Sequence, residues 1–89
     1  MSYYLELSRH VDRVFRKLSK RDKKRLEMAW KKIREIVDNP ERFKPLRGEQ
    51  FGSWRVHIDS SFVLTYEIDW ANKTVRILDL DHHDKIYDK

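Results

Sequence analysis

Apolar residues recur along this chain with two different periods, and the change of period divides it into a helical first half and a stranded second half. The first helical stripe, at the i, i+3, i+4, i+7 spacing of one helix face, consists of Val11, Val14, Phe15 and Leu18. A second stripe of the same kind consists of Leu26, Ala29, Trp30, Ile33, Ile36 and Val37. Two helices joined by so short a turn must pack as an antiparallel hairpin.

Local signals mark the ends of these helices. Ser8 precedes the first stripe as a plausible N-cap, because its hydroxyl can accept from a free N–H of the first turn. Ser19, with Asp22 three residues later, resembles a capping box for the second helix. Pro40 ends that helix, because the residue before a proline avoids the α region.

Strand patterns follow a connecting loop over residues 40–53. Residues 54–58 and 62–68 alternate between apolar and polar side chains, and residues 74–80 are predicted to form a third long strand. The turns at 59–61 and 69–73 are short, so consecutive strands must be antiparallel. A short strand at residues 3–7 precedes the helices.

These elements predict an α+β fold of order β-α-α-β-β-β, with the helical hairpin packed on one face of a small antiparallel sheet. A length of 89 residues allows one domain, which we assign to residues 1–89. The chain has no Cys, which excludes disulfides and thiolate metal sites. It also has no apolar run near membrane-spanning length and no signal-peptide pattern at its start, so we expect a cytoplasmic protein with no membrane contact.

The net charge of +5 conceals a strong asymmetry. Residues 9–34 hold 12 Lys and Arg against 3 Asp and Glu, whereas residues 35–89 hold 8 against 11. The helical half can therefore attract a polyanion by counterion release. The charge alone is equally consistent with a solvated helix face whose Lys and Arg residues keep the protein soluble.

The face of the sheet that points away from the helices carries the candidate chemistry. If Trp54, Val56 and Ile58 face the helices, then Arg55 and His57 lie side by side on the open face. The chain end, with His83 and Tyr87, can return beside them. Cleavage of RNA by its own 2′-OH needs a base, an acid and a positive charge, and imidazole suits proton transfer near neutrality.

Other interpretations of the same residues remain. A strand His such as His57 is commonly a solvated surface residue, and Tyr87 can simply pack its ring. The pair His82–His83 with Asp81 and Asp84 has the ligand types of a metal site. Four consecutive side chains rarely converge on one ion, however, so we predict no metal site.

Four segments in order resemble the RelE/ParE toxin superfamily. Residues 39–48 (NPERFKPLRG) are similar to the joint "nP…kpL.G", and residues 52–58 (GSWRVHI) to the strand "g.wr..i". Residues 62–68 (FVLTYEI) are similar to "yrviYei", and residues 82–87 (HHDKIY) to "gHR..vY". The match covers nearly the whole chain and implies the same α+β fold.

The polar residues look most like the YafQ branch of that superfamily. There His57, His83 and Tyr87 fall on two His positions and the terminal aromatic. Lys44 replaces a His, while Ser61 and Phe62 stand where that branch has Asp and Trp.

In the RelE branch, Arg55 and His57 fall on two catalytic Lys positions. Val63 stands where that branch has its key Arg.

The resemblance implies a toxin of a type II toxin–antitoxin system that cleaves mRNA on the ribosome, without metal or cofactor, leaving a 2′,3′-cyclic phosphate. The implied catalytic residues are His57, His83, Tyr87 and Arg55. The implied RNA-binding residues are Lys44, Arg47, Ser61, Phe62 and Lys85. The implied partners are a cognate antitoxin, ribosomal RNA and mRNA. A ParE-like topoisomerase-binding toxin, which shares the fold, remains an alternative, although the His content argues against it. Because Val63 and Ser61 depart from the pattern, a non-catalytic binding module remains a second alternative.

Overall fold

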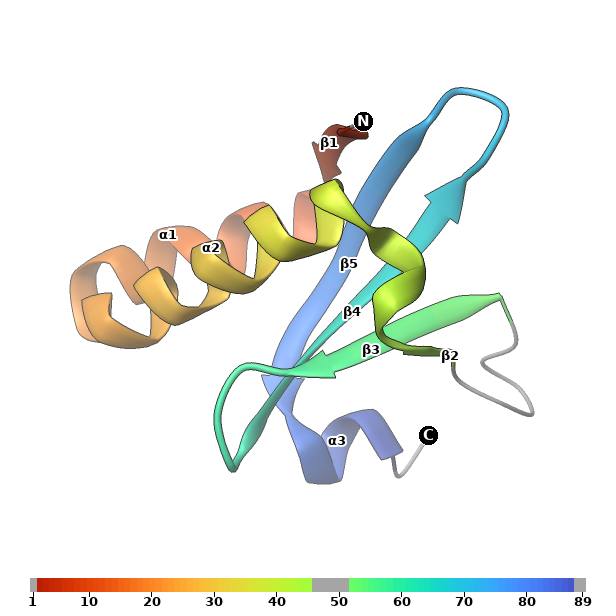
Figure 1. Cartoon of the computed structure of the whole chain (residues 1–89). Coiled ribbons are helices and arrows are strands. Elements are labelled where there is room, and N and C mark those ends of the chain that lie inside the picture. Colours follow the sequence, from red (N-terminus) through yellow and green to blue (C-terminus); the bar gives the residue numbers. More distant parts are fainter. Residues whose placement is uncertain (1, 46–51, 88–89) are drawn as a thin grey trace.

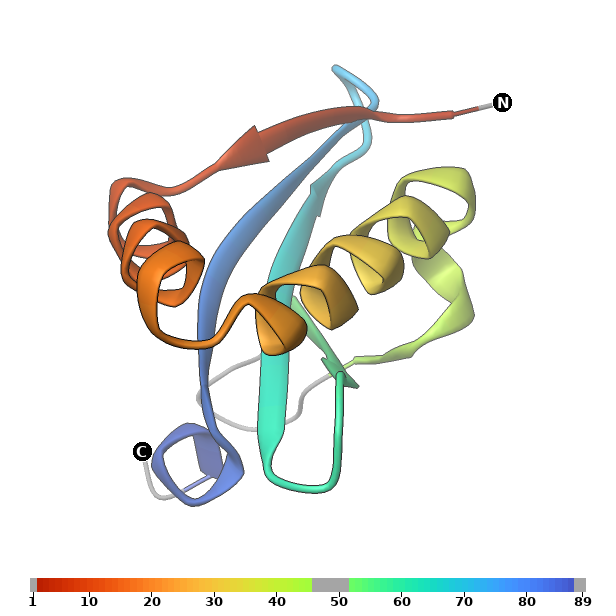
Figure 2. The same ribbon diagram turned by 90° about the vertical axis from the view of Figure 1, so that its left-hand side faces the viewer.

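The computed structural model describes residues 2–45 and 52–87, with Lys44, Pro45 and Tyr87 described by their backbone alone. Two helices, α1 (Arg9–Arg21) and α2 (Lys23–Asp38), lie against a sheet formed mainly by the second half of the chain. Figure 1 shows the helical hairpin on one side of the strands, and Figure 2 shows both helices in front of the sheet. The predicted α+β architecture is confirmed.

The helical hairpin forms where the periodicity placed it, with one correction at its turn. The Ser8 hydroxyl accepts from the backbone N–H of Val11 at 3.1 Å and so caps α1 as predicted. The predicted cap at Ser19 is wrong, because α1 continues through Arg21. Asp22 alone separates the helices and caps α2, accepting from the N–H of Arg25 at 3.1 Å. A carboxylate caps as well as a hydroxyl, so the turn needs no further residue.

Five strands form one sheet in the order β1-β5-β4-β3-β2. Their bounds are β1 Tyr4–Leu7, β2 Lys44–Pro45, β3 Ser53–His57, β4 Phe62–Asp69 and β5 Thr74–His82. The pairs β2–β3, β3–β4 and β4–β5 are antiparallel, as the short turns require. The pair β1–β5 is parallel, so the sheet is mixed and not wholly antiparallel. These two strands are joined by most of the chain, so no hairpin turn fixes their relative direction.

One apolar core lies between the hairpin and the sheet. It joins Val11, Phe15, Ala29, Ile33 and Ile36 of the helices to Val56, Ile58, Leu64, Tyr66, Val75, Ile77 and Leu80. Tyr66 is fully buried, and its hydroxyl donates to the carbonyl of Pro40 at 2.6 Å. That bond ties β4 to a short 3-10 turn, η1 (Pro40–Arg42), and burial raises the pKa of the Tyr66 phenol. No described helix has both the length and the apolar content that crossing a bilayer requires.

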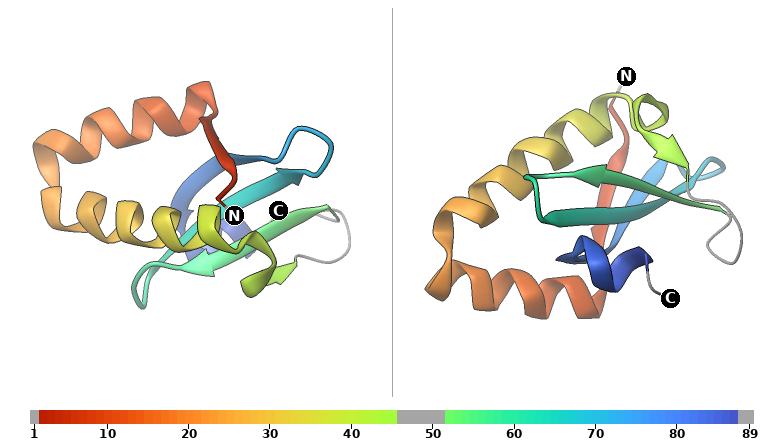
Figure 3. Two further views of the ribbon diagram at one scale, coloured as in Figure 1. Left: turned by 45° about the horizontal axis from the view of Figure 1, so that its top comes forward. Right: turned by 90° about the horizontal axis from the view of Figure 1, so that it is seen from below.

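The opposite face of the sheet was expected to be open, and at one end this is wrong. A third helix, α3 (His83–Tyr87), follows β5 directly and packs against β4 and β5. Val63 of β4 and Ile86 of α3 are almost fully buried although neither belongs to the core under the hairpin. Figure 3 shows α3 near the turn between β3 and β4, away from the tip of the hairpin.

Candidate functional site

The register of the sheet places the polar residues of the second half in rows. His57 pairs with Val63, and Val63 pairs with Asp81. Two residues along β3 from His57, and so on the same face, Arg55 lies between Lys44 and Thr65. Directly opposed residues of neighbouring strands point to the same face. The predicted neighbours Arg55 and His57 therefore share the face that points away from the hairpin.

Imidazole rings gather where β3, β4 and α3 meet. The ring centroids of His57 and His83 lie 6.5 Å apart, although 26 positions separate the residues in the chain. The ring of His82 lies 5.3 Å from that of His83. His57 is exposed, while His82 and His83 are partly buried. The expected proximity of His57 and His83 is thus present, with His82 as an additional member of the cluster.

A turn between β3 and β4 holds His83 in place. The backbone N–H of His83 donates to the carbonyl of Ser61 at 2.7 Å. The same turn is closed by Asp59, whose Oδ1 accepts from the N–H groups of Ser61 and Phe62, each at 2.8 Å. This is the local side-chain to backbone bonding for which Asp is favoured in turns.

Asp59 is in turn fixed by Arg25 of α2, whose Nε lies 3.2 Å from the carboxylate. Burial alone would raise the pKa of Asp59. The hydrogen bonds from Ser61, Phe62 and Arg25 favour the ionised form more strongly, so the pKa lies below its ordinary value. The carboxylate is therefore a stable anchor for the turn at neutral pH.

Phe62 lies between a cation and an imidazole. The guanidinium of Arg25 sits 3.9 Å from its ring centroid, and the His82 ring meets it edge-on at 5.7 Å. Both contacts are favourable for an aromatic ring. Together with Asp59 they connect α2 to the imidazole cluster.

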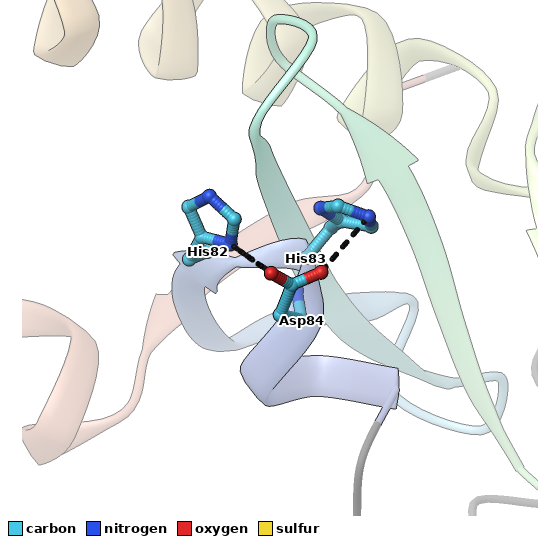
Figure 4. A group of neighbouring side chains, drawn as sticks. All are labelled: His82, His83 and Asp84. Carbon is cyan, nitrogen blue, oxygen red and sulfur yellow. Dashed lines mark hydrogen bonds and ion pairs between the residues drawn. The ribbon is translucent and has the colours of Figure 1, made fainter.

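A smaller group lies at the junction of β5 and α3, drawn in Figure 4. His82 Nδ1 is 3.5 Å from one carboxylate oxygen of Asp84, and His83 Nε2 is 3.2 Å from the other. One ligand-type atom from each of the three residues lies within 4.8 Å of the others. The carboxylate sits between the two rings.

The remaining predicted residues are placed as follows. Ser61 contributes its backbone to the turn, and Lys85 is exposed on α3. Lys44 is brought opposite Arg55 by β2. Tyr87 is the last residue of α3, and Arg47 lies outside the described residues. No observation assigns a role to these residues, so their catalytic and RNA-binding roles stay predictions.

The hairpin presents a cationic surface next to this region. Its exposed cations are Arg9, Arg13, Arg16, Lys17, Lys20, Arg21, Lys23, Lys24, Lys31 and Arg34. A hollow of about 270 Å³ lies between α1 and the sheet. Leu18, Phe62 and Leu80 give it apolar walls, and Lys17 and Arg21 lie at the same hollow. Phe62 thus lines the hollow beside α1 and also contacts the His82 ring of the imidazole cluster.

Sequence reasoning missed two residues that position the cluster, Arg25 and Asp59. For Asp59 a signal exists, because Asp followed by two Ser is typical of a turn closed by a carboxylate. For Arg25 the sequence holds no such signal. Its contact with Asp59 spans 34 positions and follows only from how α2 crosses the sheet.

The fold defines a small α+β protein, and comparison with known proteins gives the family. The sequence model described as "ParE toxin of type II toxin-antitoxin system, parDE" matches residues 5–87. The protein of Methanocaldococcus jannaschii named "Putative toxin RelE4" is 49% identical over 87 residues, covering 98% of this chain and 93% of that protein.

Solved structures agree with this. The toxin–antitoxin complex RelBE2 from Mycobacterium tuberculosis contains a chain with a TM-score of 0.79 and 27% identity, covering 92% of this chain and 99% of its own. A metal-bound toxin from Helicobacter pylori has a TM-score of 0.77 at 21% identity, covering 96% and 99%, which shows a shared fold. The chain belongs to the ParE toxin family of type II toxin–antitoxin systems, within the RelE/ParE superfamily.

Proposed function

We propose that this toxin is a ribosome-dependent mRNA endonuclease that works by acid–base catalysis. The observation that carries the proposal is the approach of the His57 and His83 rings to 6.5 Å from two distant parts of the chain. Two imidazoles on opposite sides of one phosphate can act as base and acid in the same reaction.

The chemistry needs only the RNA itself. One imidazole removes the proton of a ribose 2′-OH, and that oxygen attacks the adjacent phosphorus. The bond from phosphorus to the 5′-oxygen breaks, and the second imidazole protonates the departing oxygen. The products are a 2′,3′-cyclic phosphate and a free 5′-OH. Because an imidazole can both accept and donate a proton, either ring can serve in either role.

Positive charge beside the rings would stabilise the phosphorane. Arg55 is two residues from His57 on the same strand face, and Lys44 lies opposite Arg55 across the β2–β3 pair. We assign both to the scissile phosphate. Tyr87 would stack a base or orient the 2′-OH, and Arg47, Ser61, Phe62 and Lys85 would contact neighbouring nucleotides. The hollow beside Phe62 supports this, since a base can stack there while Lys17 and Arg21 meet phosphates.

The exposed cations of the hairpin support contact with ribosomal RNA. The twelve Lys and Arg in residues 9–34 give this segment a positive charge that would neutralise RNA phosphates regardless of the nucleotide sequence. Such binding would weaken steeply with salt. A cognate antitoxin is the expected protein partner, because the M. tuberculosis relative was solved as a toxin–antitoxin complex.

Replacement of His83 by Ala tests the proposal. Expression of the wild type should arrest growth, and primer extension on ribosome-bound message should reveal new 5′ ends. His83→Ala should remove both while the circular dichroism spectrum is unchanged. Arg76→Gln is the control, because Arg76 pairs with Glu6 and Glu67, away from the imidazole cluster and from the hollow beside Phe62. Equal cleavage by wild type and His83→Ala would refute the assignment.

A second candidate function follows from the matching family, which is named for ParE. In it, the protein binds a gyrase-type topoisomerase and cleaves no RNA. A supercoiling assay separates the two. Inhibition of supercoiling without new RNA ends would select the topoisomerase partner. Absence of both activities in folded protein would select a non-catalytic binding module, which the departures at Ser61 and Val63 motivate.

A further inference from the structure

The side chains of His82, His83 and Asp84 converge, although these residues are consecutive in the sequence. Three consecutive side chains of one strand or one helix point in different directions. Here β5 ends at His82 and α3 begins at His83, so the chain changes direction within the group. As Figure 4 shows, this change turns the two rings toward the carboxylate of Asp84.

The spacing fits a tetrahedral ion. Bonds of about 2.0–2.2 Å from zinc to nitrogen or oxygen imply ligand–ligand separations of about 3.4 Å. The measured separations from the Asp84 carboxylate are 3.5 Å to His82 Nδ1 and 3.2 Å to His83 Nε2. All three ligand atoms lie within 4.8 Å of one another, so small side-chain rotations suffice to close the set.

The ligands are held by contacts of their own, which lowers the cost of ordering them. The ring of His82 rests against Phe62, and the backbone N–H of Asp84 lies 3.3 Å from His82 Nδ1. That long hydrogen bond turns the Nδ1 lone pair toward the group and is weak enough for an ion to replace. The backbone of His83 is fixed by the carbonyl of Ser61. Outer contacts of this kind orient metal-binding histidines in proteins.

The surroundings also favour a cation. Asp81 immediately precedes the group, and its carboxylate accepts from the N–H of His82 at 2.7 Å. Imidazole and carboxylate together are the ligand types that suit Zn²⁺ and its neighbours in the first transition row. Three protein ligands leave a fourth position for water.

We propose that His82, His83 and Asp84 bind a divalent transition-metal ion of the Zn²⁺ class, and that the bound ion inhibits RNA cleavage. The second part rests on the proposed function. Coordination uses the lone pair of the His83 imidazole, which is the same lone pair that proton transfer requires. Metal binding and acid–base cleavage therefore exclude each other at this residue.

Direct binding is tested on the untagged full chain with Co²⁺ and Zn²⁺. Co²⁺ should give the visible absorption of a tetrahedral site with a stoichiometry of one, and Zn²⁺ should displace it. Calorimetry should show binding weakened at least tenfold in His82→Ala and in Asp84→Asn. The matched control His10→Ala should bind as the wild type does. Absence of 1:1 binding, or equal binding by Asp84→Asn and wild type, would overturn the site.

The inhibitory role is tested separately by ribosome-dependent cleavage with a chelator and with added Zn²⁺. Wild type should cleave with the chelator and lose most of its activity with Zn²⁺, while His82→Ala should cleave under both conditions. Zn²⁺ that leaves wild-type cleavage unchanged, or increases it, overturns the inhibition. If no cleavage occurs under either condition while Co²⁺ binding is intact, the nuclease proposal fails and the metal site stands.

Discussion

Two polar clusters share the sheet face that points away from the hairpin, and they differ in how their charges are satisfied. At one end Arg76 is paired with Glu6 at 2.9 Å and with Glu67 at 3.3 Å, beside a hollow of about 490 Å³. At the other end His57 and His83 face each other, with His82 and Asp84 beside them. The first, which we call the compensated cluster (Arg76, Glu6 and Glu67), pairs its cation with carboxylates, whereas the second gathers three imidazole rings near one carboxylate. The site that we propose thus lies away from the larger of these two hollows.

The largest expected effect is on the cleavage rate, and it distinguishes the function of the two clusters. His57→Ala should reduce ribosome-dependent cleavage by about 10²–10⁴-fold, the range that a general acid or base contributes. Arg76→Gln, on the same face but in the compensated cluster, should leave the rate unchanged. The rates are compared by primer extension at matched protein concentration. A similar loss in both variants would show that the two clusters do not differ in function.

The contact beneath α3 gives the next largest effect, this time on stability. Ile86 is 2% exposed and lies on α3, which packs against β4 and β5, so Ile86→Ala should cost roughly 2–5 kcal/mol in the free energy of unfolding. A domain of this size is only marginally stable, so a loss of this size is a large fraction of its free energy of unfolding. Denaturant titration measures the loss. Surface substitutions usually change the free energy of unfolding by less than about 0.5 kcal/mol, so a loss that small would mean that Ile86 does not anchor α3.

Asp59 should have a smaller effect that depends on pH. Asp59→Asn removes the charge that binds Arg25 and weakens the turn, at a cost of about 1–3 kcal/mol at neutral pH. The folded-state pKa of Asp59 lies below its ordinary value of 3.8. The stabilisation is therefore complete above that value and is lost as the pH falls through the folded-state pKa. The stability difference between wild type and Asp59→Asn should shrink in that acid range, measured by thermal unfolding across pH. A difference that is constant with pH would contradict the role of the charge.

The smallest effect is expected in the compensated cluster. The side chains of Arg76 and Glu6 are about half exposed, at 47% and 52%, so their ion pair is strongly screened. Arg76→Gln should change the free energy of unfolding by less than about 1 kcal/mol, and by still less at high salt. Urea titrations at low and high salt measure this. A larger loss that persists at high salt would mean that this cluster supports the sheet by more than charge.

Much of the fold was predictable because its signals are local. The helical stripes depend on neighbours within one or two turns, and Val56 and Ile58 alternate with His57 because strand side chains alternate by geometry. The cap at Ser8 and the end of α2 before Pro40 are equally local. Helix α3 was missed, because five residues are too few to establish a helical period.

The sequence by itself thus determined the helical hairpin, the antiparallel strands and the side of the sheet that faces the core, since each follows from periods of two or 3.6 residues. Only the tertiary structure decided that β1 runs parallel to β5, that α3 packs against β4 and β5, and that the rings of His57 and His83 come close. These depend on register between segments far apart in the chain, and in β4–β5 the register shifts at Thr65 and Tyr66. Because a shift of one residue exchanges the two faces of a strand, no local pattern can fix which imidazoles come together.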